Sequence, residues 1–256
     1  MQYKKRKQIR KIKDIAMLAL ASVTCVAVLI GCQSPDMTPG SAQIESLAMA
    51  ARQTGDAKSE RRLIDLAAQG LPVAQRELGL LFEQRPKQRD EALQLFERAA
   101  RAGDAEAAFE LGEMLRIGVI GVAPAPNKAW PWYKMAAQQK HAKAALMLGM
   151  LFKNGDGVPR DAIEGAKWLT LAGDLGNAHA MFLLSNLYRE GAGVPQDAAK
   201  ARVLLEESAE HEYPPAIQEL ALTVQTGDAL TARDDLRAAH LLKEASEHRH
   251  NNWNHY

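Results

Sequence analysis

Histidine side chains gather near the end of the chain, where their spacing could support metal binding. His248, His250 and His255 lie within the last nine residues, and His240 precedes His248 by eight positions, about two helical turns on roughly the same face. Converging imidazole nitrogens can hold a transition metal. No cysteine or firmly placed carboxylate joins them, so we expect no metal site and favour a polar tail or a partner-binding peptide over residues 249–256.

Cys32 is the second residue whose position suggests chemistry. It follows a lysine- and arginine-rich start and an apolar run over residues 15–30 that holds no charged residue. A run of this length is short for a membrane-spanning helix of about 20 residues, and it is typical of the core of a secretory signal peptide. The run ends in Leu29-Ile30-Gly31-Cys32, which resembles the cleavage box of bacterial lipoproteins.

That resemblance implies that the peptide bond between Gly31 and Cys32 is cut and that the cysteine becomes the first residue. The small Gly31 fits the peptidase, and the Cys32 thiolate is nucleophilic enough to form a thioether with a diacylglycerol. We therefore expect a removed signal peptide over 1–31, and a palmitate-bearing anchor with a flexible tether over 32–41. The alternative is an uncleaved signal anchor, with Cys32 at a membrane edge.

The residues that follow Cys32 bear on the membrane to which the protein is sorted. Gln33 and Ser34 include no aspartate of the kind that retains lipoproteins at the inner membrane. The resemblance then implies an outer-membrane lipoprotein that faces the periplasm of a diderm bacterium. Cys25 lies in the segment to be removed, which leaves one cysteine and excludes an internal disulfide.

The charges of the mature chain exclude one class of partner. Removing residues 1–31 leaves 25 basic and 30 acidic residues, a net charge of about −5. Nucleic-acid-binding domains carry clustered positive charge, which this chain lacks outside its export signal. We expect a protein or peptide partner in the cell envelope and a membrane contact through the lipid, with no nucleic acid.

The sequence lacks the patterns of known enzyme classes. It holds no H-E-x-x-H, G-x-S-x-G, C-x-x-C or Walker-type loop. The acidic pairs Glu206-Glu207 and Asp234-Asp235 are adjacent along the chain, so on a helix their side chains point about 100 degrees apart and do not face one bond. The two G-x-G sequences lack the third glycine of a dinucleotide site. We expect no catalytic residue and no cofactor.

A sequence repeat sets the elements that would position any site. The stretch over 144–175 recurs at 180–211, with every matched landmark displaced by 36 residues. Apolar positions within each copy fall three and four apart, which predicts amphipathic helices. The first copy separates its two helices by Gly155-x-Gly157-Val158-Pro159-x-Asp161, and the second by the equivalent residues 191–197. We expect the first glycine to end a helix in the left-handed conformation, the proline to prevent its continuation and the aspartate to cap the next helix.

The repeat extends over most of the chain. A leucine followed by a small residue marks each first helix at spacings of 33, 37, 36 and 36 residues: Leu78-Gly79, Leu111-Gly112, Leu148-Gly149, Leu184-Ser185 and Leu220-Ala221. Pairs of small residues, from Ala67-Ala68 to Ala245-Ser246, mark each second helix. A fixed period of this length indicates stacked supersecondary units, so we expect about five units plus a degenerate N-terminal one over 42–248.

The glycines of these steps need a structural reason, because glycine inside a helix costs roughly 1 kcal/mol relative to alanine. Close approach of two helices is that reason, and later units carry other small residues at the same position. We expect large side chains of the second helices, Phe96, Trp132 and Trp168 or its neighbours, to lie in the grooves so opened.

The unit A-x-x-x-L-G-x-L-(F/Y)-x-x-G-x-G-V-P-x-D, followed by a helix with Trp-Leu and a small pair, closely resembles the Sel-one-like repeat, a relative of the tetratricopeptide repeat. The resemblance implies an all-α fold, an α-solenoid of antiparallel helix pairs. It also implies a non-catalytic scaffold in an envelope assembly such as exopolysaccharide export, secretion or conjugation machinery. The alternative is an envelope enzyme or a regulator that acts on cell-wall material or a periplasmic hydrolase. Trp130, Tyr213 and Trp253 are the aromatic residues least tied to the repeat, and we name them as candidate binding contacts.

Overall fold

The computed structural model describes residues 39–118, 123–229 and 232–252. The chain divides into two units, Met1–Gly40 and Ser41–Tyr256, and the described helices lie in the second. These helices are α2 (Ser41–Thr54), α3 (Ala57–Ala68), α4 (Pro72–Glu83), α5 (Arg89–Arg101), α6 (Ala105–Ile117), α7 (Pro126–Gln138), α8 (Ala142–Asn154), α9 (Ala162–Asp174), α10 (Ala178–Glu190), α11 (Ala198–Glu210), α12 (Pro214–Thr226) and α13 (Asp235–Asn252). The short 3-10 helix η1 (Pro86–Gln88) precedes α5.

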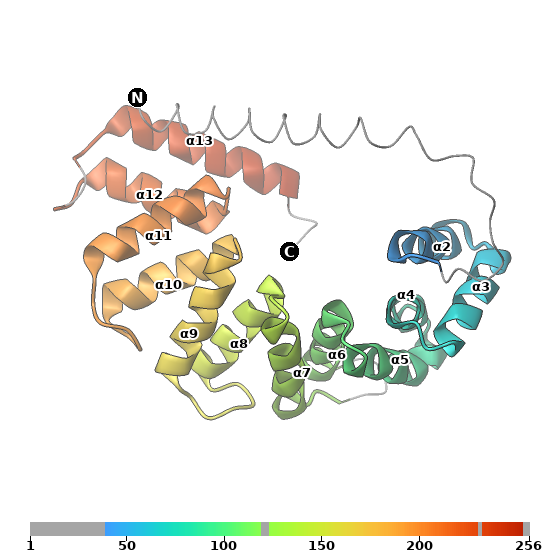
Figure 1. The fold of residues 1–256 in the computed structure, drawn as a ribbon. Coiled ribbons are helices and arrows are strands. Elements are labelled where there is room, and N and C mark those ends of the chain that lie inside the picture. The colour runs from blue at the N-terminus through green and yellow to red at the C-terminus, as the bar shows by residue number, and fades with distance from the viewer. Residues whose placement is uncertain (1–38, 119–122, 230–231, 253–256) are drawn as a thin grey trace. The chain divides into compact units, whose positions relative to one another are not determined.

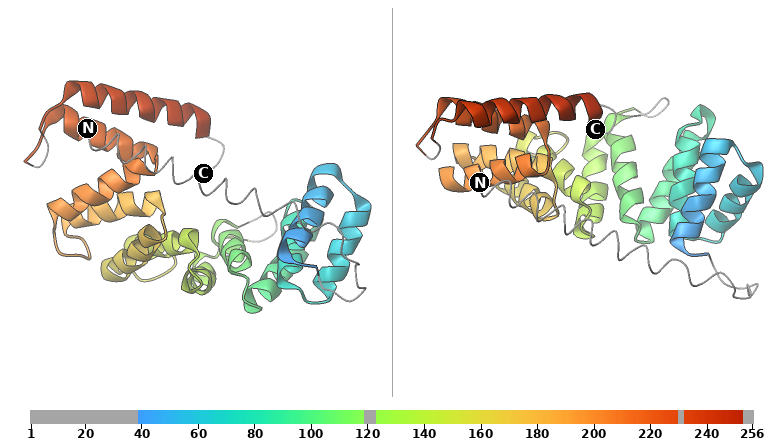
Figure 2. Two further views of the ribbon diagram at one scale, coloured as in Figure 1. Left: turned by 45° about the horizontal axis from the view of Figure 1, so that its top comes forward. Right: turned by 90° about the horizontal axis from the view of Figure 1, so that it is seen from above.

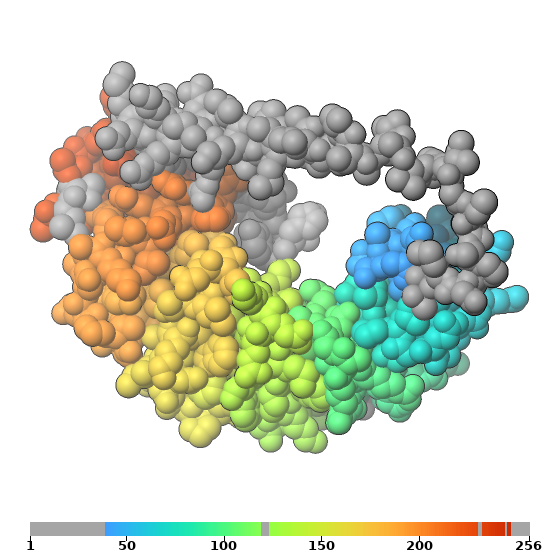
Figure 3. All heavy atoms as spheres, viewed as in Figure 1, coloured from blue at the N-terminus to red at the C-terminus, as the bar shows by residue number. Residues whose placement is uncertain are grey.

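Each helix contacts the one before it and the one after it, and the helix pairs of the second unit follow one another along a curved row (Figure 1). Two further views show the same order, with α13 beside α12 in both (Figure 2). In the space-filling view, neighbouring repeats are in contact along the row (Figure 3). The predicted all-α solenoid of antiparallel helix pairs is confirmed.

The glycine turns end the first helices as the sequence predicts. Helix α8 ends at Gly155, where φ is 84°, and α10 ends at Gly191, where φ is 71°. Both residues are left-handed, a conformation that glycine adopts freely because it has no Cβ. The carboxylates of Asp161 and Asp197 accept hydrogen bonds from backbone amides in the first turns of α9 and α11. The glycine therefore fixes where the first helix ends, and the aspartate fixes where the second helix begins.

Close helix approach accounts for the glycines inside the first helices. An ideal Cβ built at Gly79, Gly112 or Gly149 would lie 2.6–2.9 Å from a side-chain carbon of the following helix. Non-bonded carbon atoms prefer a separation of about 3.5–4.0 Å, so an added methyl group would force the two helices apart. The space that each glycine leaves is therefore filled by the neighbouring side chain.

The side chains that fill these grooves correct the prediction in one unit. Phe96 lies against its glycine as expected, but Tyr133 takes the place predicted for Trp132, and Leu169, the neighbour of Trp168, takes the third place. Adjacent residues on a helix point about 100 degrees apart, so only one of each pair can enter the groove. Trp132 and Trp168 instead lie at the margin of the core, partly buried.

The buried apolar residues form two clusters. The larger runs from Ile44 in α2 to Leu187 in α10, and the smaller begins at Leu205 in α11 and continues into α12 and α13. The boundary falls inside the helix pair α10–α11. In the preceding pair, by contrast, Leu148 of α8 and Leu169 of α9 share one cluster. The fully buried core is therefore interrupted within a single repeat, and partly buried side chains, Leu204 of α11 and Phe182 of α10, pack across the boundary.

The two ends of the chain bear on other predictions. Gly31 and Cys32, with the rest of the predicted signal and most of the tether, lie outside the described residues. Helix α13 continues to Asn252, so the first residues of the segment expected to be a polar tail are helical. Among the described helices, none combines the length and apolar character needed to span a membrane.

Candidate functional site: the exposed face of the first helices

One side of each first helix is only partly buried. We count positions from the residue that precedes the helix: Asp104 for α6, His141 for α8 and Asn177 for α10. In these helices positions 3, 7, 8 and 10 are buried, whereas positions 2, 5, 6 and 9 are partly or fully exposed. We call the latter the first-helix face, and its residues are Glu106, Phe109, Glu110 and Glu113 in α6, Lys143, Leu146, Met147 and Met150 in α8, and His179, Phe182, Leu183 and Asn186 in α10.

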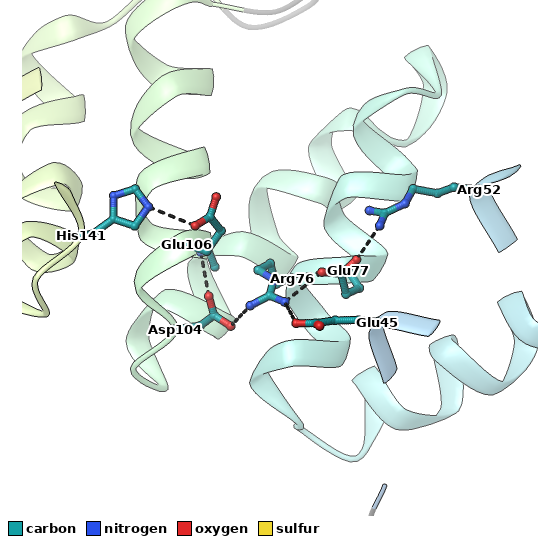
Figure 4. A network of polar contacts seen from close by, with 8 residues as sticks. Glu45, Arg52, Arg76, Glu77, Asp104, Glu106 and His141 are labelled. Atoms are coloured by element: carbon teal, nitrogen blue, oxygen red, sulfur yellow. Dashed lines mark hydrogen bonds and ion pairs between the residues drawn. The ribbon is translucent and has the colours of Figure 1, made fainter. Parts of the chain in front are cut away.

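A charged network centred on Arg76 joins α2, α4 and the start of α6 (Figure 4). Its Nη1 lies 3.1 Å from Asp104 Oδ2, and its Nη2 lies 2.8 Å from Glu45 Oε1 and 2.9 Å from Glu77 Oε1. Arg52 Nη2 lies 2.9 Å from the other carboxylate oxygen of Glu77. The side chains of Glu77 and Asp104 are each 6% exposed, so water screens these pairs little. Removing Arg76 would leave the buried charge of Asp104 without compensation.

His141 links α6 to α8 through both of its ring nitrogens. Its Nδ1 accepts a hydrogen bond of 3.1 Å from the Ala144 amide and so caps α8, and its Nε2 lies 3.0 Å from Glu106 Oε2. An acceptor at Nδ1 requires the proton of the neutral ring to sit on Nε2, which then donates to the Glu106 carboxylate. This hydrogen bond lowers the pKa of Glu106. The Phe109 ring stacks on His141, with centroids 4.7 Å apart.

The residue before each first helix contacts the first helix of the preceding repeat in several units. Asp104 caps α6 and pairs with Arg76 of α4, and His141 caps α8 and contacts two side chains of α6. Tyr213, which precedes α12, stacks on His179 of α10 with ring centroids 5.0 Å apart. This shared position is therefore the point at which neighbouring repeats are joined along the first-helix face.

Glu110 lies on this face without a direct ion pair among the described residues, and the more distant Lys143 only partly offsets the rise in its pKa. Burial and the neighbouring carboxylates Glu83, Glu106 and Glu113 raise the pKa of Glu110 to about 7. Glu113 pairs with the Arg116 guanidinium and Glu106 accepts a hydrogen bond from His141, whereas Glu110 forms no ion pair within the described ranges. Burial also raises the pKa of Glu83. A cation brought to this point from outside would therefore favour the ionised form of Glu110.

Glu113 differs from Glu110 because its carboxylate is hydrogen-bonded to the second helix of its repeat, α7. The Tyr133 hydroxyl donates a hydrogen bond of 2.6 Å to Glu113 Oε1, and Arg116 Nη2 lies 2.6 Å from the other carboxylate oxygen. Burial, followed by the contact with Glu113, raises the pKa of Tyr133 well above its usual range. The hydroxyl therefore stays protonated and acts as a donor.

The residues named from sequence fall in different places. Tyr213 lies at the edge of the first-helix face. Trp130 lies in α7, and its ring is edge-on to that of Phe152 with the ring centroids 6.5 Å apart. Trp253 and Cys32 lie outside the described residues. Within the described ranges, no group of three histidine, cysteine, aspartate or glutamate side chains is placed to hold a metal ion.

Sequence reasoning missed the residues that form the network. Arg76, Asp104 and His141 are far apart in the chain, and they meet because repeats stack. Two of them could have been found, since Asp104 and His141 occupy the position before a predicted helix, where a side-chain acceptor is favoured. Glu110 carried no local signal.

Five successive segments of the chain match the family model of the Sel1 repeat: residues 72–104, 105–141, 142–177, 178–213 and 214–250. Each matched segment holds one first helix and one second helix. Helices α2 and α3 precede the first matched segment.

Two solved structures share this fold. The protective antigen c5321 of uropathogenic Escherichia coli gives a TM-score of 0.69 at 26% identity, over 81% of this chain and 46% of that chain. A Sel1 repeat protein from Oxalobacter formigenes gives a TM-score of 0.67 at 23% identity, over 83% of this chain and 88% of that chain.

One curated relative is the Chitin synthase regulator SKT5 of the fungus Malassezia restricta. It is 37% identical over 71 residues, which make up 27% of this chain and 5% of the relative. The chain thus spans less than half of the Escherichia coli antigen and a small part of the fungal regulator.

Proposed function

This chain belongs to the Sel1 repeat family, and from that premise we propose that it is a non-catalytic scaffold that holds a partner protein against its first-helix face. Sel1 repeat proteins generally mediate protein–protein interactions, and such scaffolds are generally non-catalytic. Stacked repeats present extended surfaces suited to this task. The first-helix face is the part of this chain whose chemistry fits such a partner.

The observation that carries the proposal is the change in character of the face from α6 to α8. Glu110 in α6 is a half-buried carboxylate without a direct ion pair in the described ranges, and Met147 and Met150 in α8 are partly buried. A partner segment with a lysine or arginine beside apolar side chains would neutralise the Glu110 carboxylate and cover the two methionine side chains. Methionine adapts its shape to the surface it meets, and complementary charge fixes the orientation of the partner.

The place of action is proposed from the sequence. A lipid on Cys32 would fasten the scaffold to the outer membrane on its periplasmic side, and residues 32–41 would serve as the tether. Tethering raises the effective concentration of the scaffold near other membrane-bound proteins. We propose that it serves an envelope assembly, of the kind found in exopolysaccharide export, secretion or conjugation.

A second candidate is regulation of an envelope enzyme by direct binding. It is favoured by the description of the fungal relative as the regulator of a synthase, although the match covers only 71 residues. In that case the first-helix face would hold the enzyme itself, for example a periplasmic hydrolase, in place of a structural component.

A site-specific photo-crosslinking experiment tests the scaffold and separates it from the regulator. The full chain is expressed in its own host with a benzophenone amino acid at Met147, and the matched control carries the same group at Ile163, which is 60% exposed on the second helix α9. We expect one defined envelope protein to crosslink from Met147 and not from Ile163. A structural component supports the scaffold, an enzyme supports the regulator, and equal crosslinking at both positions would contradict binding on this face.

A further inference from the structure

A cavity of about 130 Å³ lies between α10, α11 and α12, and its Arg189 donates a hydrogen bond to Asn186 at the edge of the first-helix face. Two arginines, Arg189 and Arg202, and two carboxylates, Glu219 and Asp228, line it together with small and apolar residues of α11. No comparable polar space was expected from the repeat, whose recurring residues serve close packing. The sequence of this repeat explains why the cavity exists.

Ser185 opens the space between α10 and α11. In the preceding repeat the equivalent residue is Gly149, and the place where its Cβ would lie is 2.6 Å from Cγ of Leu169. Ser185 carries a Cβ and a hydroxyl at that place, so Leu205, the equivalent of Leu169, is excluded from the corresponding position. Both Ser185 and Leu205 line the cavity. The close packing of the earlier repeats is therefore relaxed at this one position.

Two further positions change from apolar to polar around the same cavity. Thr223 stands where the four earlier first helices carry a buried apolar side chain: Leu81, Met114, Leu151 and Leu187. Arg202 stands where three earlier second helices carry an apolar residue: Leu93, Trp130 and Ala166. The apolar core divides at this place. Departures from local packing rules that gather at one point are typical of binding sites.

Arg202 is the residue whose hydrogen-bonding capacity is incomplete. Its side chain is 12% exposed, and its Nη2 lies 2.6 Å from Asp228 Oδ2. Its Nη1 is buried and has no hydrogen-bond partner among the described residues. Arg189, by comparison, is 54% exposed and is paired with Glu219. A buried guanidinium nitrogen without an acceptor destabilises the fold unless a ligand supplies one.

We propose that this cavity binds a carboxylate group, which accepts a hydrogen bond from Arg202 Nη1. The planar guanidinium matches a carboxylate in shape, and Leu205 and Ala201 provide apolar wall for the carbon atoms next to the carboxylate. Nη1 is shielded from water in this conformation, so the guanidinium turns toward the cavity as the ligand enters. Asp228 is 42% exposed, so its place beside Arg202 borders on solvent and the new carboxylate can exchange with it there.

The lining distinguishes a carboxylate from other anions and from neutral ligands. Glu219 and Asp228 would repel a doubly charged phosphate, whereas a single carboxylate can replace one of them beside Arg202. A neutral amide offers an acceptor without the charge and therefore forms a weaker bond to the guanidinium. The carboxylate comes either from a partner's side chain or chain end, or from a free organic acid. This proposal is independent of the first-helix face.

Thermal unfolding of the full chain in detergent tests the proposal with propionate, propionamide and inorganic phosphate at matched ionic strength. For the unmodified chain we expect propionate, at about ten times its Kd, to raise the Tm by about 3–6 °C. Propionamide and phosphate should raise it by less than a third of that amount. Equal shifts with all three probes, or no shift with propionate, would overturn the proposal.

The variant Arg202→Leu separates a binding role from a structural one. Leucine restores the residue of an earlier repeat, so we expect the Tm without ligand to rise by about 2–4 °C and the propionate response to disappear. A structural ion pair predicts the opposite, a lower Tm. Arg101→Leu, which removes an exposed arginine paired with Glu97, is the matched control and should keep the full propionate response.

A second variant keeps Arg202 in place. Ser185→Gly restores the residue that permits close approach in the earlier repeats, so α11 can close the cavity, and the propionate response should fall at least tenfold in affinity. An unchanged response in this variant counts against the cavity as the site. The source of the carboxylate follows from crosslinking at Met147: loss of the captured protein in Arg202→Leu indicates a partner's carboxylate, and retained capture indicates a free acid.

Discussion

Arg76 and Asp104 lie 3.1 Å apart across the boundary between two repeats, with side chains 14% and 6% exposed. Asp104 also accepts a hydrogen bond of 2.8 Å from the Ala107 amide, so one carboxylate caps α6 and anchors α4. The two tasks can be separated by substitution, because asparagine caps a helix and carries no charge.

Substitution of Asp104 should therefore give two different losses of stability. Asp104→Asn keeps the cap and leaves Arg76 short of one carboxylate, and Asp104→Ala removes both interactions. We expect the alanine variant to be less stable than the asparagine variant by about 1 kcal/mol, the typical contribution of a cap. Urea unfolding followed by circular dichroism measures the difference. Equal losses would mean that the cap contributes nothing.

Arg76→Met should destabilise the chain by about 3–5 kcal/mol, because it leaves the buried carboxylate of Asp104 without a cation and that of Glu77 with Arg52 alone. Arg101→Met removes an exposed pair with Glu97 and should cost no more than about 1 kcal/mol. The same urea titrations compare the two variants. A similar small loss in both would show that burial does not strengthen the Arg76 network.

Glu110 makes stability depend on pH. Its pKa in the folded chain, about 7, lies above the ordinary value of 4.5, so the folded state binds the proton more tightly than the unfolded state. Stability from this group is present at acidic pH and is lost as pH rises from about 4.5 through 7. Glu110→Gln should therefore exceed the unmodified chain only slightly near pH 5 and by about 2 kcal/mol at pH 8, after partial solvent screening.

The control for Glu110 is Glu206→Gln, which changes an exposed glutamate in α11. Its difference from the unmodified chain should be small and the same at both pH values. Free energies of unfolding at pH 5 and pH 8 decide the matter. If Glu110→Gln shows no gain at the higher pH, the carboxylate is better solvated than its surroundings indicate.

The glycines inside helices should divide into two kinds when changed to alanine. At Gly112 the new Cβ would meet Tyr133 Cε1 at 2.6 Å, and we expect a loss of about 1–3 kcal/mol from overpacking. At Gly173 the nearest atom is Met181 Cγ at 3.5 Å, an ordinary contact, and the better helix former should raise stability by up to about 1 kcal/mol. Thermal unfolding of both variants compares the two changes in stability. If close helix approach is not the reason for Gly112, the two alanine variants should have similar stabilities.

Deletion of residues 142–177 removes one matched repeat and brings His141 to the position that Asn177 occupies before α10. Both residues cap the helix that follows them, so the new junction keeps its capping side chain. Because repeats contact chiefly their neighbours, we expect helicity per residue to stay nearly constant. Circular dichroism measures this, and complete unfolding would indicate a globular core rather than an array.

Cys32→Ser tests the anchor. Serine lacks the thiolate that forms the thioether, so we expect no incorporation of labelled palmitate and accumulation of the uncleaved precursor. Cys25→Ser is the matched control and should mature normally, since that residue lies before the cleavage point. Normal processing of the Cys32 variant would sink the lipoprotein assignment.

Local chemistry could be predicted from sequence, and contacts between repeats could not. Gly155 and Asp161 act within their own turn, so residue type and spacing suffice to place them. Trp132 and Tyr133 are adjacent, so a small rotation of α7 about its axis decides which of the two side chains faces Gly112. Periodicity alone does not resolve this rotation. Arg76 meets a carboxylate 28 positions later, and that pairing depends on how two repeats stack.

Arg202 shows that a signal can be present and still be overlooked. It is a charged residue at a position where the three preceding repeats carry Leu93, Trp130 and Ala166. Aligning the repeats for what differs between them, in addition to what recurs, would have marked it. The recurring residues define the scaffold, and the exceptions mark the places where packing is relaxed.

The interruption of the apolar core between α10 and α11 has a consequence for how the molecule comes apart. In stacked repeats cooperativity passes from unit to unit through shared apolar surface, so a break in that surface is a point where opening can stop. We therefore expect the C-terminal helices α11, α12 and α13 to form a separate foldon, whose amides exchange with solvent at a lower free energy than those of α4 to α9. The chain would then open from one end while the rest of the array stays folded.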